Sequence, residues 1–324
     1  MAYLLEIKDL TIGYNWENGF STVVNHFNLS IEEGTIYGIA GESGSGKSTM
    51  AQAVYHSLKY PGEVKSGEVL YKGTDIFKLK PNELRKLRAN EMSFVPQAAM
   101  NALNPVKRIG DQFGDIMIAH GKNPLKHMEE VSEVLSMVRL DPKIILDAYP
   151  HELSGGMRQR TVIAMALVLN PEFVILDEPT TGLDVLVEHD ILVDLKRIQR
   201  NRKFSMLMIT HDLSVLYEIS DKIGMMYAGE LTEFGSREDM LDNPAHPYNY
   251  LLLKSIPRIG QGRYEGIKLK GSPGNYEDNF SGCQFIKRCP YSVGECEITT
   301  PRLRLSEEKD HFTRCLRYPA FKNI

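Results

Sequence analysis

The sequence lacks the features of a secreted or membrane-spanning chain. Its longest apolar stretch, residues 162–169, falls well short of the roughly 20 residues that cross a bilayer. Glu6, Lys8 and Asp9 interrupt the apolar region that a secretory signal would need. With 38 basic and 42 acidic side chains, the formal net charge of −4 supplies no general field for nucleic acid or anionic lipid. We therefore expect a soluble, cytoplasmic protein with no nucleic-acid partner, in which any phosphate binding is local.

Cysteine is scarce but clustered. The chain has four cysteines, and all lie beyond residue 280: Cys283, Cys289, Cys296 and Cys315. Disulfides are rare in cytosolic proteins, so the choice lies between a metal site and four unliganded thiols. Most zinc sites contain a closely spaced cysteine pair, which this spacing lacks. Basic side chains near the cysteines would offset the negative charge of an iron–sulfur cluster. Spacing alone leaves all three interpretations open.

The hydrophobic pattern indicates an α/β fold. At 324 residues and 42% hydrophobic, the chain can bury a large core and suggests two units. Residues 35–40 form a short, nearly uncharged run, and residues 50–58 have a helical pattern. Residues 173–176 and 206–209 are strand candidates separated by a helical stretch, 185–199. Strands that alternate with helices predict a parallel sheet covered on both faces.

Three other regions depart from this alternation. Residues 5–12 and 23–31 have the loose alternation of half-buried strands, and residues from about 98 to 165 have helical spacing. Beyond about residue 235, prolines and glycines interrupt any long element. We expect one domain over residues 1–235, with a helical subdomain at about 98–165, and an irregular extension over residues 236–324. The glycine-rich loop occurs once, which predicts one nucleotide site.

That loop, residues 41–48, fits the pattern G-x-x-x-x-G-K-[ST]. Its glycines let backbone N–H groups turn toward phosphate oxygens at the start of a helix. Lys47 would reach the β- and γ-phosphates, and Ser48 would ligate Mg²⁺. The predicted nucleotide contacts are therefore Gly41, Ser43, Gly44, Ser45, Gly46, Lys47, Ser48 and Thr49.

Two carboxylates follow the apolar run at residues 173–176. Asp177 suits Mg²⁺ coordination, and Glu178 suits the base that orients and deprotonates an attacking water. Paired acids after a strand are most often a solvated loop, but a phosphate-binding loop elsewhere in the chain makes the catalytic interpretation the better one.

A further segment carries a family resemblance. Residues 153–160, Leu-Ser-Gly-Gly-Met-Arg-Gln-Arg, resemble the signature sequence of ATP-binding cassette (ABC) ATPases. The resemblance implies a P-loop NTPase core with a parallel sheet, an N-terminal antiparallel β-subdomain and a helical subdomain. It also implies that Ser154, Gly155 and Gly156 face the γ-phosphate of ATP held by another subunit. The active form would then be a head-to-tail dimer with two nucleotides at its interface.

Other positions match the family in order along the chain. Tyr14 resembles the aromatic residue that stacks on adenine, and Gln97 resembles the glutamine that links the metal and water to the transmembrane partner. Asp184 resembles the aspartate of the D-loop, and His211 the switch histidine at the γ-phosphate. The resemblance implies that Lys47, Gln97, Glu178 and His211 are the catalytic residues, and that Ser48, Gln97 and Asp177 hold Mg²⁺.

The resemblance extends to one subfamily. Residues 94–105, 149–152, 179–185 and 246–257 resemble those of the ATPase subunits of dipeptide and oligopeptide importers. This implies an ATPase on the cytoplasmic face of the cell membrane, bound to two transmembrane permease subunits and to a second, identical or related ATPase, and supplied by an extracytoplasmic solute-binding protein. Importers of oligosaccharides or nickel share this machinery, and a soluble ABC ATPase outside transport is the other alternative.

The cysteine spacing resembles that of peptide-importer ATPases whose extension carries a [4Fe-4S] cluster. The resemblance implies that Cys283, Cys289, Cys296 and Cys315 are its ligands, with zinc as the alternative metal.

Overall fold

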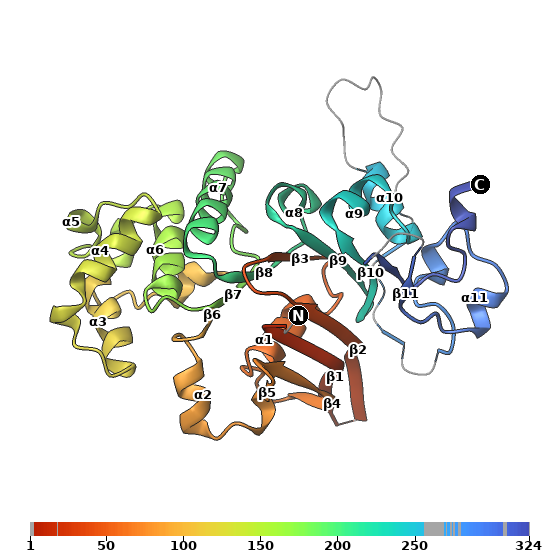
Figure 1. The fold of residues 1–324 in the computed structure, drawn as a ribbon, viewed down its shortest axis with the longest axis horizontal. Helices are drawn as coiled ribbons and strands as arrows, with labels where there is room; N and C mark the ends of the chain where they lie inside the picture. The colour runs from red at the N-terminus through yellow and green to blue at the C-terminus, as the bar shows by residue number, and fades with distance from the viewer. Residues whose placement is uncertain are drawn as a thin grey trace.

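The computed structural model describes residues 3–17, 19–255, 269, 271–272, 274, 276–277, 280–306 and 310–323. Their strands form two sheets (Figure 1). The smaller sheet is antiparallel, in the order β2 (Gly19–Ile31), β1 (Leu5–Trp16), β4 (Gly62–Tyr71), β5 (Thr74–Asp75). It corresponds to the predicted N-terminal antiparallel subdomain. The sequence pattern had not indicated β4.

The larger sheet has a parallel centre. Its order is β11 (Arg304–Leu305), β12 (Phe312–Thr313), β10 (Glu230–Ser236), β9 (Lys222–Tyr227), β3 (Ile36–Ala40), β8 (Ser205–Thr210), β7 (Phe173–Asp177), β6 (Met92–Val95). Strands β6, β7, β8, β3 and β9 run parallel, and β10 and β12 pair in antiparallel fashion. The carboxyl ends of β3, β7 and β8 therefore lie at one edge of the sheet, where α/β proteins place their ligands.

The described α-helices connect and cover these sheets. They are α1 (Lys47–Val54), α2 (Pro81–Leu87), α3 (Ile109–Ala119), α4 (Met128–Met137), α5 (Pro142–Ile145), α6 (Gly155–Leu167), α7 (Val185–Arg202), α8 (Leu213–Ile219), α9 (Arg237–Asp242), α10 (Pro247–Ser255) and α11 (Glu295–Ile298). Short 3₁₀ turns are η1 (Ile76–Lys78), η2 (Ala99–Ala102), η3 (Pro124–Lys126), η4 (Pro150–Glu152), η5 (Ile286–Arg288) and η6 (Ala320–Asn323). The described chain contains no helix long and apolar enough to cross a membrane.

One predicted helix differs from the structure in its bounds, and the predicted helical region consists of several helices. The helix after the glycine loop begins at Lys47 and ends at Val54, rather than covering residues 50–58. Within the predicted helical region, α3 ends at Ala119 because the chain turns at Gly121 with φ +72°, and α4 begins at Met128. Helices α3 to α6 gather at one end of the molecule, and the C-terminal region lies at the other (Figure 1). Ile256 and Pro257, part of the predicted tail motif, lie outside the described residues.

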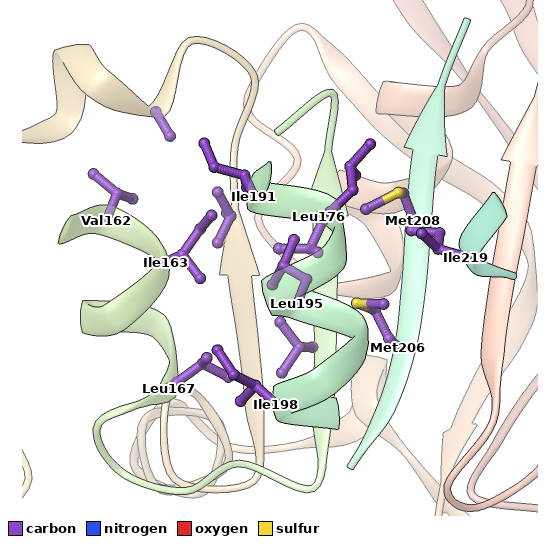
Figure 2. Packing of buried hydrophobic residues seen from close by; sticks show 14 of the residues in the cluster. Val162, Ile163, Leu167, Leu176, Ile191, Leu195, Ile198, Met206, Met208 and Ile219 are labelled. Carbon is purple, nitrogen blue, oxygen red and sulfur yellow. The ribbon is translucent and has the colours of Figure 1, made fainter. Parts of the chain in front are cut away.

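Both faces of the parallel sheet are buried. In β8, Met206 and Met208 face one hydrophobic cluster, and Leu207 and Ile209 face another. The first cluster contains α6 and α7, whose Ile163, Leu167, Leu195 and Ile198 pack together as Figure 2 shows. The second contains Met50 and Val54 of α1, covered in turn by β1 and β2 of the small sheet. Each such buried side chain contributes about 1.5–3 kcal/mol to folding.

The C-terminal region is joined to the core through a buried carboxylate on β10. Glu233 is fully buried and accepts hydrogen bonds from the backbone N–H groups of Ala245 (2.7 Å) and His246 (2.9 Å). Its Oε1 also lies 2.8 Å from Nε2 of His311, which precedes β12. The extension thus adds strands to the large sheet and is anchored to it by paired polar groups.

Acid is expected to destabilise the fold through His246. Burial, reinforced by the nearby Arg314, lowers the pKa of His246 to about 3, and its Nδ1 accepts the N–H of Tyr248 at 3.0 Å. A histidine whose pKa falls on folding stabilises the fold only while it is neutral, so this stability is lost as the pH falls below about 6.5. Between pH 7 and pH 5 the free energy of unfolding should fall by about 2 kcal/mol more than in His246→Asn, measured by denaturant titration. Equal losses in the two proteins would contradict this prediction.

Candidate nucleotide site

The glycine-rich loop follows β3 and closes onto the start of α1. Gly46 caps the helix with φ +94°, and a Cβ atom there would lie 2.7 Å from the carbonyl oxygen of Val23. A Cβ atom at Gly41 would lie only 2.2 Å from the carbonyl oxygen of Met226. Larger residues are therefore excluded at both positions, and the loop lies tightly against its neighbours. No side chain caps α1 at Gly46, so the start of this helix offers backbone N–H groups to an anion.

Lys47 is buried inside this loop. Its Nζ donates hydrogen bonds to the carbonyl oxygens of Gly41 (2.7 Å) and Glu42 (2.9 Å), and lies 3.3 Å from Oγ of Ser45. Burial lowers the pKa of Lys47, while the carboxylates of Glu178, Asp177 and Glu42 act in the opposite direction. The site therefore holds a partly desolvated cation whose present partners are neutral carbonyl groups, and such a cation attracts phosphate strongly.

Ser48 and Asp177 meet at the carboxyl end of β7. The Ser48 hydroxyl donates to Oδ1 of Asp177 at 2.9 Å, and Asp177 is 1% exposed. Burial raises the pKa of Asp177 to about 6, with Glu178 adding to the rise and the Ser48 hydrogen bond opposing it. A hydroxyl and a carboxylate are oxygen ligands of the kind Mg²⁺ prefers, and Mg²⁺ completes its shell with waters and phosphates. The donor set fits that ion.

Glu178 is held by three side chains. Its Oε2 accepts hydrogen bonds from Nε2 of Gln97 and Oγ1 of Thr181, both at 3.0 Å, and its Oε1 lies 3.3 Å from Nδ1 of His211. The backbone of Glu178 has φ +48°, a conformation that few residues other than glycine adopt and that often occurs at functional sites. The structure therefore brings together the predicted Gln97, Glu178 and His211, and adds Thr181, which no sequence motif had singled out.

The predicted signature residues and Asp184 lie at the N-termini of two other helices, α6 and α7. Ser154 caps α6 by accepting the N–H of Met157 at 3.3 Å, and Asp184 caps α7 by accepting the N–H of Val187 at 3.0 Å. A Cβ atom at Gly156 would lie 2.7 Å from Val187, so the starts of the two helices are in close contact. Helix α6 belongs to the helical end of the molecule, whereas α1 lies beneath the small sheet (Figure 1). Tyr14 lies near α1, with its hydroxyl 3.3 Å from Oγ1 of Thr49.

Known proteins share this arrangement. The family model described as "ABC transporter" matches residues 24–181, which include the glycine loop, Gln97 and Glu178. The chain is 39% identical over 311 residues to the dipeptide transport ATP-binding protein DppD of Caldanaerobacter subterraneus subsp. tengcongensis, covering 95% of each chain. The chain belongs to the ABC transporter family of ATP-binding proteins.

Further comparisons place this ABC ATPase more finely. It is 40% identical over 301 residues to the oligopeptide transport ATP-binding protein OppD of Escherichia coli, covering 92% of this chain and 89% of that one. The model described as "Oligopeptide/dipeptide transporter, C-terminal region" matches residues 232–296. The dimeric structure of the bacterial ABC transporter cassette MJ0796 superposes with a TM-score of 0.64 at 28% identity, covering 72% of this chain and 98% of that chain. A dimeric MJ0796 structure with ADP and Pi bound matches with the same TM-score at 27% identity and the same coverage.

The four cysteines of this ABC ATPase lie around one small cavity. Cys283, Cys289, Cys296 and Cys315 line a space of about 20 Å³ together with His246 and Phe285. Burial raises the pKa of Cys289 and Cys315 to about 11 and that of Cys283 to about 12, so these three thiols are protonated without a cation. Among the described residues no three His, Cys, Asp or Glu side chains are arranged to hold a metal ion. The predicted metal centre is therefore not found as a formed site, although its ligands converge.

Proposed function

We propose that this ABC ATPase hydrolyses ATP to power the import of dipeptides and oligopeptides through a membrane complex. The observation that carries the proposal is similarity over nearly the whole chain, extension included: the DppD relative covers 95% of it, and the peptide-transporter model matches residues 232–296. The alternatives are an importer of the same composition that carries oligosaccharides or nickel, and a soluble ABC ATPase without membrane partners. The extension favours peptide cargo.

Within the site we propose roles that combine these contacts with the family resemblance. Lys47 holds the β- and γ-phosphates, Tyr14 stacks on adenine, and Ser48, Asp177 and Gln97 hold Mg²⁺, which offsets phosphate charge when bound. Glu178 is the general base: its carboxylate lies at the carboxyl end of β7 and is oriented by Gln97, Thr181 and His211. His211 also provides a donor toward the γ-phosphate. The remaining loop residues supply backbone N–H groups.

We propose a head-to-tail dimer in which each ATP is closed in by the partner's signature segment. Ser154, Gly155 and Gly156 lie at the N-terminus of α6, where backbone N–H groups can bind an anion. Helix α6 and helix α1, which follows the glycine loop, lie in different parts of the chain's fold (Figure 1). Next to Asp184, the side chains of Val185 and Leu186 are 78% and 79% exposed. These two exposed aliphatic side chains are available for contact with a partner subunit. The second ATPase is a copy of this chain or a related one.

In the complete importer we propose two transmembrane permease subunits and an extracytoplasmic solute-binding protein, with this chain on the cytoplasmic face of the membrane. Tagged chain purified from detergent-solubilised native membranes should retain two multi-spanning proteins and an ATPase. Reconstituted in vesicles, that complex should import peptide only with ATP, and the complex carrying Glu178→Gln should not. Recovery of soluble partners alone would overturn the transport proposal, and uptake of oligosaccharide or nickel instead of peptide would overturn the cargo.

We also propose that the extension, residues 236–324, binds a [4Fe-4S] cluster. All four thiols line one cavity, and Arg317, which lines it with them, would offset part of a cluster's negative charge. A cluster of several irons holds its thiolates farther apart than a single ion does, so it does not need the tight grouping of a zinc site. Its expected part is structural, since a region this small and irregular cannot bury a large core.

Metal analysis tests the cysteine site. Full-length protein purified without oxygen should contain about four iron and four sulfide per chain, and Cys289→Ser should lose most of both. Ser292→Ala is the matched control, because Ser292 lines the same cavity without a thiolate. About one zinc per chain, with no iron, would overturn the cluster and identify the site as a zinc site. No metal in either protein would identify the cysteines as unliganded thiols.

A further inference from the structure

The extension reaches directly into the phosphate-binding loop. Arg288 donates two hydrogen bonds to the carboxylate of Glu42, from Nη1 to Oε2 at 2.5 Å and from Nη2 to Oε1 at 3.0 Å. These residues are 246 positions apart in sequence. The contact is well protected, since the Arg288 side chain is 5% exposed and that of Glu42 is 25% exposed. A bidentate, largely buried arginine–carboxylate pair is both stronger and more directional than a surface ion pair.

Glu42 is fixed through its backbone as well as its side chain. Its N–H donates to the hydroxyl of Tyr248, on α10, at 3.0 Å. Its carbonyl oxygen accepts Nζ of Lys47 at 2.9 Å and the N–H of Ser45 at 3.2 Å. Residue 42 is thus the point at which the C-terminal region, the loop backbone and the phosphate-binding lysine are joined.

Aromatic packing holds Arg288 in place. Its guanidinium lies over the ring of Tyr227, 5.6 Å from the centroid. Phe285 packs against Tyr227 and Tyr248, with ring centroids 5.0 and 5.4 Å away. Phe285 also lines the cysteine cavity, and Arg288 directly precedes Cys289. The same short segment therefore carries two cysteines and the arginine that contacts the loop.

The negative charge of Glu42 affects nucleotide binding through this contact. The Glu42 carboxylate is close enough to Lys47 to act on its pKa. An unpaired carboxylate in that position would repel the phosphates of ATP, and the repulsion would be large because the loop is partly desolvated. Paired with Arg288, the carboxylate is neutralised and its orientation is fixed.

We propose that Arg288 is a positioning residue of the nucleotide site: through Glu42 it holds the phosphate-binding loop in the conformation that accepts ATP and neutralises a carboxylate that would otherwise repel it. This goes beyond peptide import, because it assigns the C-terminal extension a part in ATP binding. It rests only on ATP binding by the glycine loop, so it does not depend on the cargo.

Equilibrium binding of a fluorescent ATP analogue to the full-length chain tests the proposal. Arg288→Met should raise the dissociation constant about tenfold or more, and raise KM for ATP more than it lowers kcat. Lys287→Met is the matched control: it removes the neighbouring charge in η5, which pairs with exposed Glu277 at 2.6 Å, and should bind ATP as the parent protein does. Unchanged ATP affinity in Arg288→Met would overturn the proposal.

Suppression distinguishes positioning from a general loss of folding. In the double variant Arg288→Met with Glu42→Gln, the unpaired carboxylate is gone, so ATP affinity should recover to within about threefold of the parent protein. A double variant that binds as weakly as Arg288→Met would show that the unpaired Glu42 carboxylate does not repel ATP, and would overturn the neutralising role of Arg288. Should Arg288→Met not fold, Arg288→Lys serves instead: it keeps the charge, loses the bidentate geometry, and should give an intermediate loss that Glu42→Gln does not worsen.

Discussion

Replacing Glu178 with glutamine is expected to slow ATP turnover about 100- to 10,000-fold while leaving ATP binding intact. The physical reason is the position of the carboxylate, which is held between Gln97, Thr181 and His211 at the carboxyl end of β7. Glutamine has the same shape and keeps an acceptor oxygen, but it cannot take a proton from water. The variant therefore loses ATP hydrolysis, whereas the glycine loop and Lys47, which bind the nucleotide, are unchanged.

Steady-state phosphate release, ATP affinity and gel filtration with ATP measure the three parts of this prediction. The variant should release little phosphate, bind ATP with unchanged affinity, and elute as a dimer, because ATP that is not hydrolysed keeps the dimer closed. Glu172→Gln is the matched control, since Glu172 immediately precedes β7 at its far end and pairs with Lys72 on the surface at 2.7 Å. Normal turnover in Glu178→Gln would remove Glu178 from the role of base.

Much of the nucleotide site could be predicted from the sequence because its parts are locally encoded. A buried strand, a glycine loop and a helix are consecutive in residues 36–54, and Asp177 and Glu178 come directly at the end of an apolar run. Parallel strands bring their carboxyl ends to one edge, so His211 after β8 reaches Glu178 after β7. The local pattern gives the order of these residues along the chain, and the strand topology brings them together in space.

What the sequence did not indicate depends on contacts between distant segments. Strand β9 contains Gly224, which packs against Ile39 and Leu231, and a glycine inside a short apolar run weakens the strand pattern. Thr181 reaches Glu178 only because the chain turns sharply after β7. Arg288 belongs to no motif, and in the sequence it is only one of the basic residues near the cysteines. Its contact with Glu42 required β12 and α10 to bring the extension back against the core.

Replacing Lys47 with methionine is expected to weaken ATP binding about 100-fold without weakening the empty fold. Methionine retains an apolar stem that fills the loop, and it removes the ammonium together with its hydrogen bonds to the loop. Burial lowers the pKa of Lys47, which means that its ammonium is less stable inside the nucleotide-free protein than in water. The charge is thus a cost to the empty fold, and it becomes favourable when phosphate replaces the carbonyl oxygens of Gly41 and Glu42 as its partner.

Thermal unfolding with and without ATP separates these two effects. Without nucleotide the variant should unfold at the same temperature as the parent protein or slightly higher. With ATP at about 100 times the parent's dissociation constant, the parent should gain about 2.7 kcal/mol of stability and the variant less than 1 kcal/mol. Lys72→Met, which removes an exposed lysine paired with Glu172, should keep the full gain. An equal gain in Lys47→Met would mean that the loop binds ATP without its lysine, and the buried charge would then need another explanation.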